Sequence, residues 1–209
     1  MKLGEEFKSR FPGAFDVGEV LFELAQGCYA FEAFTYAAAS KDAEIAIPAL
    51  PVGAGASGTL SRVDGSEHIF DLRYYFELGK DHAFTRDGIA RSWYCGVLIS
   101  AGDLLAAHQY FDHQPEFELL YHVRNAVAHG NRFHITEAGK KRLEKYPAYL
   151  RFYDGSDRFQ LSPDLDHQRI LFDFMQAGDV ADLLSLVGER LRDLERGILG
   201  PGVNTSIFG

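Results

Sequence analysis

The chain has 209 residues, which is enough for one well-packed domain and too few for two ordinary ones. Hydrophobic residues make up 46% and charged residues 24%, the balance of a soluble globular protein, and this excludes disordered, collagen-like and fibrous coiled-coil chains. The 21 Lys and Arg residues against 30 Asp and Glu residues give a net charge of −9. Such a chain is not expected to coat nucleic acid through its overall charge, although a local basic site remains open.

The cysteines and the N-terminal residues indicate the compartment. Cys28 and Cys95 are too few to build a disulfide framework, so we expect buried free thiols in a reducing cytoplasm. Residues 1–8 lack the hydrophobic stretch of a secretory signal. No apolar run approaches the roughly 20 residues that span a bilayer. We therefore expect a soluble, cytoplasmic protein without a membrane partner.

The first half of the chain predicts two long helices separated by a less regular region. Residues 16–40 repeat apolar side chains at three- and four-residue steps, as on an amphipathic helix. Prolines and glycines in residues 45–65 predict an irregular crossing, and the aromatic-rich residues 67–84 are compatible with helix or strand. A second helix is expected over residues 86–111, where small side chains would let another helix approach closely. In residues 16–40 the side chains that share one side of the helix are Val17, Val20, Leu21, Leu24, Cys28, Phe31 and Phe34. In residues 86–111 they are Ile89, Trp93, Val97, Leu104 and His108. The small residues are Gly96, Ser100, Ala101 and Gly102.

Two further helices follow in the middle of the chain. One is predicted over residues 116–129, because it follows Pro115 and stops at Gly130, a frequent residue after helix C-termini. Thr136 is placed to cap a second, short helix over residues 137–145.

The last part of the chain predicts a hairpin and a final helix. Residues 149–161 alternate around Asp154 and the glycine that follows it, as in a β-hairpin. Residues 162–199 predict a helical segment that is broken near Gly178. Its narrow apolar seam consists of Leu184, Val187, Leu191, Leu194 and Ile198.

Together these elements predict a mainly α protein, a bundle of about four to five main helices with a small β-containing insertion. We expect residues 1–199 to form a single domain. The irregular insertion is placed at residues 46–85 and a β-hairpin region at residues 147–161. Residues 200–209 are expected to be a flexible tail.

Two patterns that could bind a cofactor lack the context that such chemistry needs. Residues 53–58 match the spacing G-x-G-x-x-G of a dinucleotide-binding loop, but prolines precede them and residues 59–65 cannot begin a convincing helix. His108 and His113 are five residues apart, whereas a helical metal pair favours four, and no cysteine completes a zinc set. We therefore predict no cofactor and no metal.

The most informative stretch is residues 121–131, which carries Arg124, Asn125, His129 and Gly130. An Arg and a His at this single spacing occur by chance about once in every two chains of this composition, so the pair alone is weak evidence. The Asn after the Arg, and the Gly after the His at a helix end, make the pattern much more specific. The stretch resembles the signature of HEPN-domain proteins, and the resemblance implies a HEPN-like helical bundle.

On a helix of about 100° per residue, the polar residues of this motif lie opposite an apolar stripe. Arg124, Asn125 and His129 span about 140° of one side, and Asn125 and His129 are close enough to touch. The apolar stripe spans about 120° of the other side. It consists of Leu119, Leu120, Val123, Ala126 and Val127. A solvated helix end, whose histidine faces the C-terminal dipole, is compatible with the same pattern.

The resemblance implies a metal-independent endoribonuclease that cleaves single-stranded RNA by attack of a ribose 2′-OH on the neighbouring phosphate. His129 would transfer protons, because histidine titrates near neutral pH. Arg124 would stabilise the phosphorane, and Asn125 would orient His129 or donate to the phosphate. One chain supplies one such histidine and the reaction favours two proton-transfer groups, so a homodimer with a shared site is implied.

The local charge agrees with a phosphate site. Residues 121–158 hold eight basic and four acidic side chains, a positive surplus in a chain that is acidic overall. Among the basic residues, Arg132, Lys140 and Lys141 are expected to bind RNA.

Other functions are compatible with the same residues. A HEPN protein could keep the polar face and serve as a non-catalytic nucleotide-binding, RNA-binding or protein-interaction module. A catalytic one could be a toxin held by an antitoxin protein, or a defence effector. Residues 135–143 resemble the wing-side stretch of some winged-helix repressors, but no recognition helix is seen before them, so DNA binding is not favoured.

Overall fold

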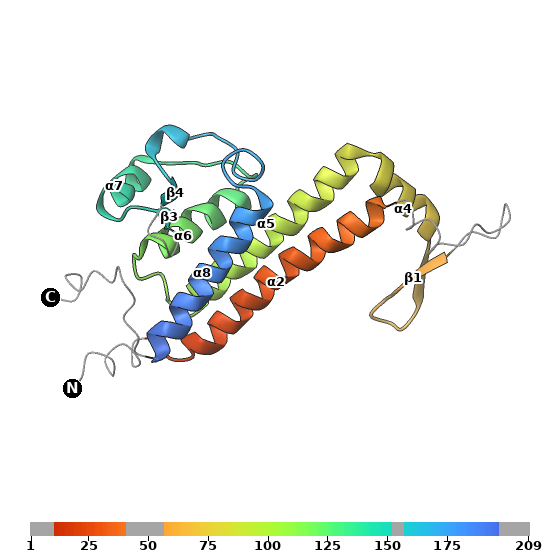
Figure 1. The fold of residues 1–209 in the computed structure, drawn as a ribbon, viewed down its shortest axis with the longest axis horizontal. Helices are drawn as coiled ribbons and strands as arrows, with labels where there is room; N and C mark the ends of the chain where they lie inside the picture. Colours follow the sequence, from red (N-terminus) through yellow and green to blue (C-terminus); the bar gives the residue numbers. More distant parts are fainter. Residues whose placement is uncertain (1–10, 41–56, 152–156, 197–209) are drawn as a thin grey trace. The chain divides into compact units, whose positions relative to one another are not determined.

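The computed structural model describes residues 11–40, 57–151 and 157–196. Within these ranges the chain is mainly helical, as predicted, with six α-helices and two two-stranded antiparallel sheets (Figure 1). The elements are α2 (Ala14–Ala39), β1 (Ser57–Ser61), β2 (Glu67–Asp71), α4 (Leu72–Asp81), α5 (Ala83–Ala107), α6 (Pro115–Ala128), α7 (Glu137–Lys145), β3 (Tyr149–Arg151), β4 (Asp157–Gln160), the short 3-10 helix η1 (Pro163–Leu165) and α8 (Ala177–Arg196). They form two compact units, and the boundaries between these units fall within α2 and α5.

Unit 1 comprises residues 1–29 and 93–209. Its described core is formed by apolar side chains of α2, α5, α6 and α8. Gly18 of α2 and Gly188 of α8 allow a close crossing, because a Cβ on Gly18 would lie 2.6 Å from the carbonyl oxygen of Gly188. Large or central members of this core are Val17, Leu21, Tyr94, Leu98, Leu105, Leu119, Leu120, Val123, Leu184, Val187 and Leu191.

Ionic contacts join α8 to α2 at the same crossing. Arg192 Nε lies 2.9 Å from Glu19 Oε1. The carboxylate of Glu195 accepts the amide hydrogen of Phe15, which is one of the amides that the first turn of a helix leaves without an internal partner. The N-terminal end of α2 is therefore held by side chains of α8 as well as by apolar packing.

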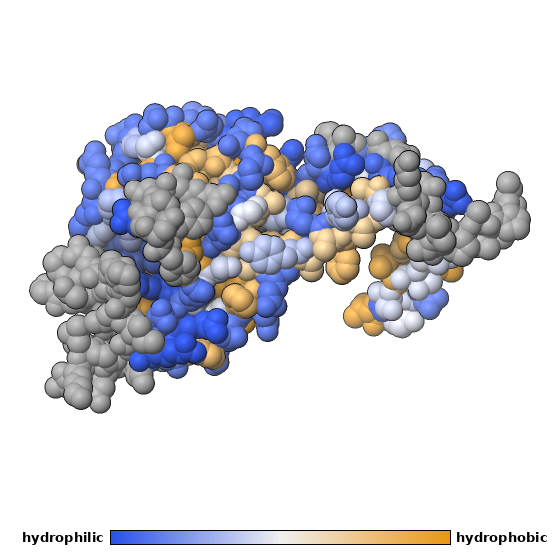
Figure 2. Space-filling view, viewed as in Figure 1, coloured by the Kyte–Doolittle hydropathy of each residue, from blue (hydrophilic) through white to orange (hydrophobic). Residues whose placement is uncertain are grey.

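Unit 2 comprises residues 30–92 and is built differently. It contains the β1–β2 hairpin and α4, whose N-cap Asp71 accepts the Tyr74 amide at 2.9 Å. No described side chain of this unit is buried. Figure 2 shows apolar surface on its hairpin region. The exposed large apolar residues of the unit include Phe34, Tyr36, Leu60, Val63, Ile69, Tyr74, Tyr75 and Ile89.

The helices predicted in the middle of the chain are confirmed. α6 covers the range expected for the third helix, and Gly130 after it has a φ of +91°, the left-handed conformation that glycine adopts without strain. α7 matches the short helix. Thr136 Oγ1 accepts the amide hydrogen of Gly139 at 3.2 Å, so the predicted cap is present.

A hairpin occupies part of the region that was predicted to be irregular. β1 and β2 pair antiparallel along their whole length. In the turn between them Gly65 has a φ of +81°, and Asp64 Oδ1 accepts the Ser66 amide at 2.9 Å. Asp-Gly is a strong turn signal, and here it outweighs the glycine-rich character of the stretch. Gly58 lies in β1, so the helix that a dinucleotide-binding loop needs does not follow it.

α5 ends short of its predicted end. Gln109 has a φ of +58°, and the amide of Tyr110 donates to the carbonyl of Leu105 at 2.9 Å, which turns the chain out of the helix. The Tyr110 hydroxyl then donates to the carbonyl of Pro12, so tertiary contact sets this boundary. The buried side of α5 is Tyr94, Val97, Leu98, Ala101 and Leu105, whereas Ile89, Trp93 and His108 of the predicted side are exposed.

The segment before α8 also differs from its prediction. Apart from the short η1, residues 162–176 are turns and irregular backbone. Their polar groups bind another part of the chain, as where Asn131 Oδ1 accepts the Leu171 amide at 2.9 Å. α8 begins at Ala177, so Gly178 lies in its first turn. The predicted seam is buried at Leu184, Val187, Leu191 and Leu194.

Other predictions fall outside the described residues. They concern the hairpin turn at Asp154, the first part of the insertion with Gly53 and Gly55, the seam residue Ile198 and the tail at residues 200–209. The hairpin that flanks the turn is present as β3 and β4.

Of the two cysteines, Cys28 is buried and Cys95 is half-buried. None of the helices in the described ranges combines the length and the apolar character that a membrane crossing requires.

The crossing of α2 and α8 gives a testable prediction. We expect Gly18→Ala to lower the free energy of unfolding by about 1–3 kcal/mol, because the added methyl group meets backbone that cannot move aside. Gly96→Ala in α5 is the matched control. A Cβ at Gly96 meets no atom within 4 Å, so alanine should raise stability by about 0.5–1 kcal/mol. Chemical denaturation measures both, and a Gly18→Ala protein as stable as the wild type would contradict the close crossing.

Candidate functional site

The polar residues of the sequence motif lie at the C-terminal end of α6. The five residues of the predicted apolar stripe are all buried, which confirms the orientation expected for this helix. Arg124 and Asn125 are half-buried and His129 is exposed. The helix therefore presents its polar side away from the core of unit 1.

The guanidinium of Arg124 is held in place by two neighbours. Its Nε donates to Asp103 Oδ1 of α5 at 2.8 Å, and its Nη2 donates to the same oxygen. Its Nη1 donates to Asn125 Oδ1 at 3.0 Å. These bonds use three of the five N–H groups, and within the described chain the other two are left for a ligand such as a phosphate.

A glycine on α5 makes this arrangement possible. A Cβ on Gly102 would collide with the Cβ and Cγ of Arg124, so the absent side chain lets the arginine stem lie against α5. The close approach predicted from the small residues of α5 is thus present at Gly102. Gly96, in contrast, has open space around it.

His129 caps α6 and is separate from the arginine cluster. Its backbone amide donates to the carbonyls of Asn125 and Ala126, both at 3.2 Å. Among the described residues, no hydrogen bond or ion pair joins its imidazole to Arg124 or Asn125. The structure therefore brings Arg124 and Asn125 into contact and leaves the His129 side chain exposed to solvent.

The three predicted RNA-binding residues differ in their availability. Arg132 Nη1 donates to the carbonyl of His167 at 2.8 Å. Lys140 Nζ lies 2.7 Å from Glu137 Oε1, and this hydrogen bond raises the pKa of the lysine. Lys141 is exposed on α7. The basic stretch is therefore partly neutralised by its own neighbours.

A second polar cluster, which the sequence did not reveal, surrounds Glu118 of α6. The side chain of Glu118 is 0% exposed. Arg142 of α7 binds it at two points, Nε to Oε2 and Nη2 to Oε1, both at 2.7 Å, and His113 Nδ1 lies 2.6 Å from Oε1. The ring of Tyr146 stacks on His113 at 3.7 Å between centroids, and the Arg142 guanidinium lies over the ring of Tyr121. The carboxylate of Glu118 is buried and both of its oxygens are bound by these neighbours, so the cluster joins α6 to α7 and leaves no carboxylate oxygen open to a ligand.

His122 lies beside this cluster as a neutral base. Its Nε2 is 4.0 Å from Glu118 Oε2 and has no hydrogen-bond partner among the described residues. Burial lowers the pKa of His122 to about 4, and the attraction of Glu118 only partly opposes this effect. Arg142 disfavours the protonated form as well.

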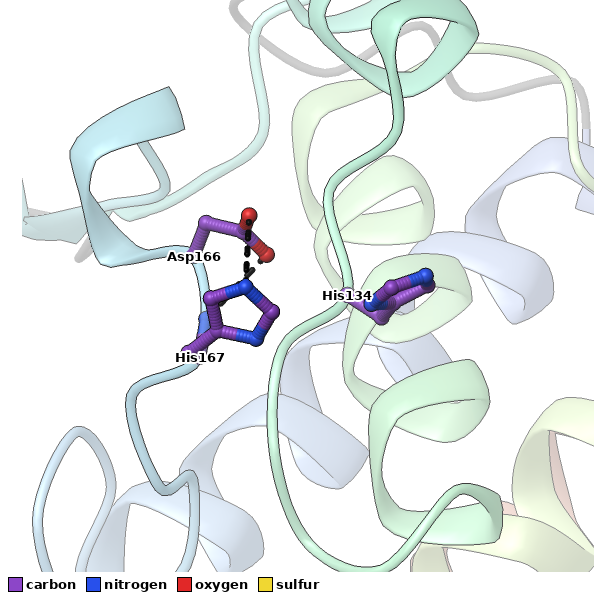
Figure 3. A group of neighbouring side chains, drawn as sticks. All are labelled: His134, Asp166 and His167. Carbon is purple, nitrogen blue, oxygen red and sulfur yellow. Dashed lines mark hydrogen bonds and ion pairs between the residues drawn. The ribbon is translucent and has the colours of Figure 1, made fainter.

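The histidines considered for a metal have other contacts. His108 packs on Tyr110, with 5.2 Å between ring centroids, and His113 belongs to the Glu118 cluster. The described residues do contain one group of three possible metal ligands, His134, Asp166 and His167 (Figure 3). No pattern in the sequence joins these three, because they come from two separate segments.

Comparisons with protein-family models, with curated proteins and with solved structures find no match to this chain. Its function is therefore inferred from its own residues and their geometry.

The low pKa of His122 predicts a pH dependence of stability. Its pKa is about 6.5 in the unfolded chain and about 4 in the fold, so between these values the unfolded state binds more protons. Stability is therefore lost as the pH falls from about 6.5 towards 4. We expect the free energy of unfolding of the wild type to fall by about 3 kcal/mol more than that of His122→Gln between about pH 7.5 and pH 4. The free energy of unfolding of both proteins is measured by chemical denaturation across this pH range. If it changes with pH equally in the two proteins, His122 is not the source of the acid destabilisation.

Proposed function

We propose that this chain is a HEPN-like protein that acts as a metal-independent endoribonuclease on single-stranded RNA. The observation that carries the proposal is the placement of Arg124. Its guanidinium is oriented by Asp103 and Asn125 on the polar side of α6, on the same helix end as the exposed His129. A pre-oriented guanidinium that can stabilise a phosphorane and an imidazole that can transfer a proton are the kinds of group that phosphoryl transfer from RNA uses.

The proposed reaction uses these side chains together with a second histidine. A neutral His129 takes the proton of the ribose 2′-OH while the 2′-oxygen forms a bond to phosphorus. Arg124 stabilises the charge on the phosphorane, and Asn125 supports the guanidinium through its Oδ1. The bond to the 5′-oxygen then breaks, and a protonated histidine donates to that oxygen. The products are a 2′,3′-cyclic phosphate and a 5′-OH.

The second histidine is proposed to come from a second copy of the chain. In a symmetric dimer, two α6 ends would face each other across the two-fold axis and supply one His129 each. RNA would enter between the protomers, guided by Arg132, Lys140 and Lys141. Lys141 is the best placed of these, because Lys140 is paired with Glu137 and Arg132 also binds backbone.

The primary test is cleavage of labelled single-stranded RNA in EDTA. We expect the wild type to leave cyclic-phosphate ends, and Arg124→Ala and His129→Ala to cut at least about 100-fold more slowly. His108→Ala, which changes another exposed histidine, is the matched control and should cut like the wild type. If none of the proteins cuts RNA, or the variants cut equally well, the catalytic proposal fails and a non-catalytic binding module is favoured.

Asp103 provides a second test, because it orients Arg124 but carries a charge that repels phosphate. We expect Asp103→Ala to lower kcat by about 10- to 100-fold through loss of orientation, without raising KM. A raised KM with an unchanged kcat would mean that Asp103 acts in RNA binding and not in positioning.

The shared site can be tested by mixing subunits. When nine parts of His129→Ala are co-refolded with one part of wild type, random pairing leaves about 1% of dimers with two wild-type chains. We expect activity to fall to about that level, because a mixed dimer holds one histidine only. Residual activity of about 10% would show that each chain works alone.

A further inference from the structure

Two segments of unit 1 lie side by side and hold each other through backbone hydrogen bonds. They are residues 131–135, which follow α6, and residues 166–171, which precede α8. The amide of Phe133 donates to the carbonyl of Gln168 at 3.0 Å, and the amide of His167 donates to the carbonyl of Phe133 at 3.0 Å. This frame sets the positions of the side chains that the two segments carry.

Three of these side chains have potential metal-binding atoms close to one another. One ligand atom from each of His134, Asp166 and His167 lies within 4.8 Å of the others. His167 Nε2 is already 3.5 Å from Asp166 Oδ2. Figure 3 shows His134 across from this pair, on the neighbouring segment.

The carboxylate of Asp166 is fixed in a way that leaves one oxygen for a ligand. Its Oδ1 accepts the amide hydrogen of Ile135 at 2.8 Å and that of His167 at 3.1 Å. The bond from Ile135 lowers the pKa of this carboxyl, and the neighbouring imidazoles lower it further. Oδ2 is the oxygen that faces His167 Nε2.

The spacing of these atoms suits a first-row transition metal. Metal–nitrogen and metal–oxygen bonds of about 2.0–2.2 Å place neighbouring ligand atoms about 3.4 Å apart in a tetrahedral site. The pair formed by Asp166 and His167 is at this separation. His134 is exposed, so packing does not prevent its ring from changing rotamer when an ion binds.

We propose that His134, Asp166 and His167 form a binding site for a divalent first-row transition-metal ion, with Zn²⁺ as the best-matched probe. Two imidazoles and one carboxylate favour Zn²⁺, Co²⁺ or Ni²⁺ over Mg²⁺ and Ca²⁺, which prefer oxygen ligands. Because the site is open to solvent, water completes the coordination. The ion ties the segment that leaves α6 to the segment that leads into α8, and so stabilises the fold.

The first experiment measures metal binding by the full chain without a polyhistidine tag, after treatment with EDTA and removal of the chelator. We expect calorimetry with Zn²⁺ to show one site per chain. At Zn²⁺ concentrations about 100-fold above Kd, Tm should rise by about 5 °C or more, and Mg²⁺ should give no comparable shift. Absence of Zn²⁺ binding by the wild type would overturn the proposal.

Variants then locate the ion. Loss of an outer-shell partner typically weakens metal affinity about 10- to 100-fold, and loss of a direct ligand should weaken it at least as much. We therefore expect His134→Gln and His167→Asn each to weaken Zn²⁺ binding at least about tenfold, and the control His108→Gln to leave it unchanged. Asn suits position 167 because His167 has a φ of +66°, which Asn tolerates. Equal Zn²⁺ affinity in wild type and both variants would place the ion elsewhere and overturn the site.

Discussion

The buried carboxylate of Glu118 is the constraint on which the arrangement of α6 and its neighbours depends. A charge that is removed from water is very costly unless it is paired and hydrogen-bonded. Here the two-point contact with Arg142 and the bond to His113 meet that requirement, and together they demand that α7 pack against α6. Since α6 also carries the apolar stripe that enters the core, only its remaining side is left for solvent and ligands.

Two of the arginine–carboxylate pairs that involve α6 differ in their surroundings and therefore in their role. In the pair of Arg142 and Glu118 the carboxylate is fully buried. Loss of Arg142 would therefore leave a buried charge without its cationic partner. The pair of Arg124 and Asp103 is much more exposed, and exposed pairs contribute only about 0–1 kcal/mol. Asp103 can thus orient Arg124 without holding it so tightly that a phosphate could not compete. An arginine–carboxylate pair thus holds the structure together near the start of α6, at Glu118. Near the end of α6, at Arg124, such a pair leaves the guanidinium available for binding.

Hydrophobic composition did not indicate where the core would lie. The chain is rich in Phe and Tyr, yet no described side chain of unit 2 is buried, and Phe34 and Tyr36 are 73% and 82% exposed. In unit 1, shorter aliphatic residues of α6 and α8 form much of the core together with a few aromatic rings. Burial depends on which faces meet in space, and the number of large apolar residues does not determine that.

Local patterns in the sequence determined the local structure of this protein. The periodicity of α6, the cap at Thr136, the glycine after His129 and the hairpin of β3 and β4 follow from interactions between residues a few positions apart, which any reader of the sequence can see. The sequence also determined that Arg124, Asn125 and His129 share the side of α6 opposite its buried stripe. Only the tertiary structure decided which partners these residues have. Asp103 is 21 positions from Arg124, Arg142 is 24 positions from Glu118, and the ligands of the proposed metal site come from two segments that only the fold brings together. Such contacts depend on the packing of whole elements, so no short-range pattern encodes them.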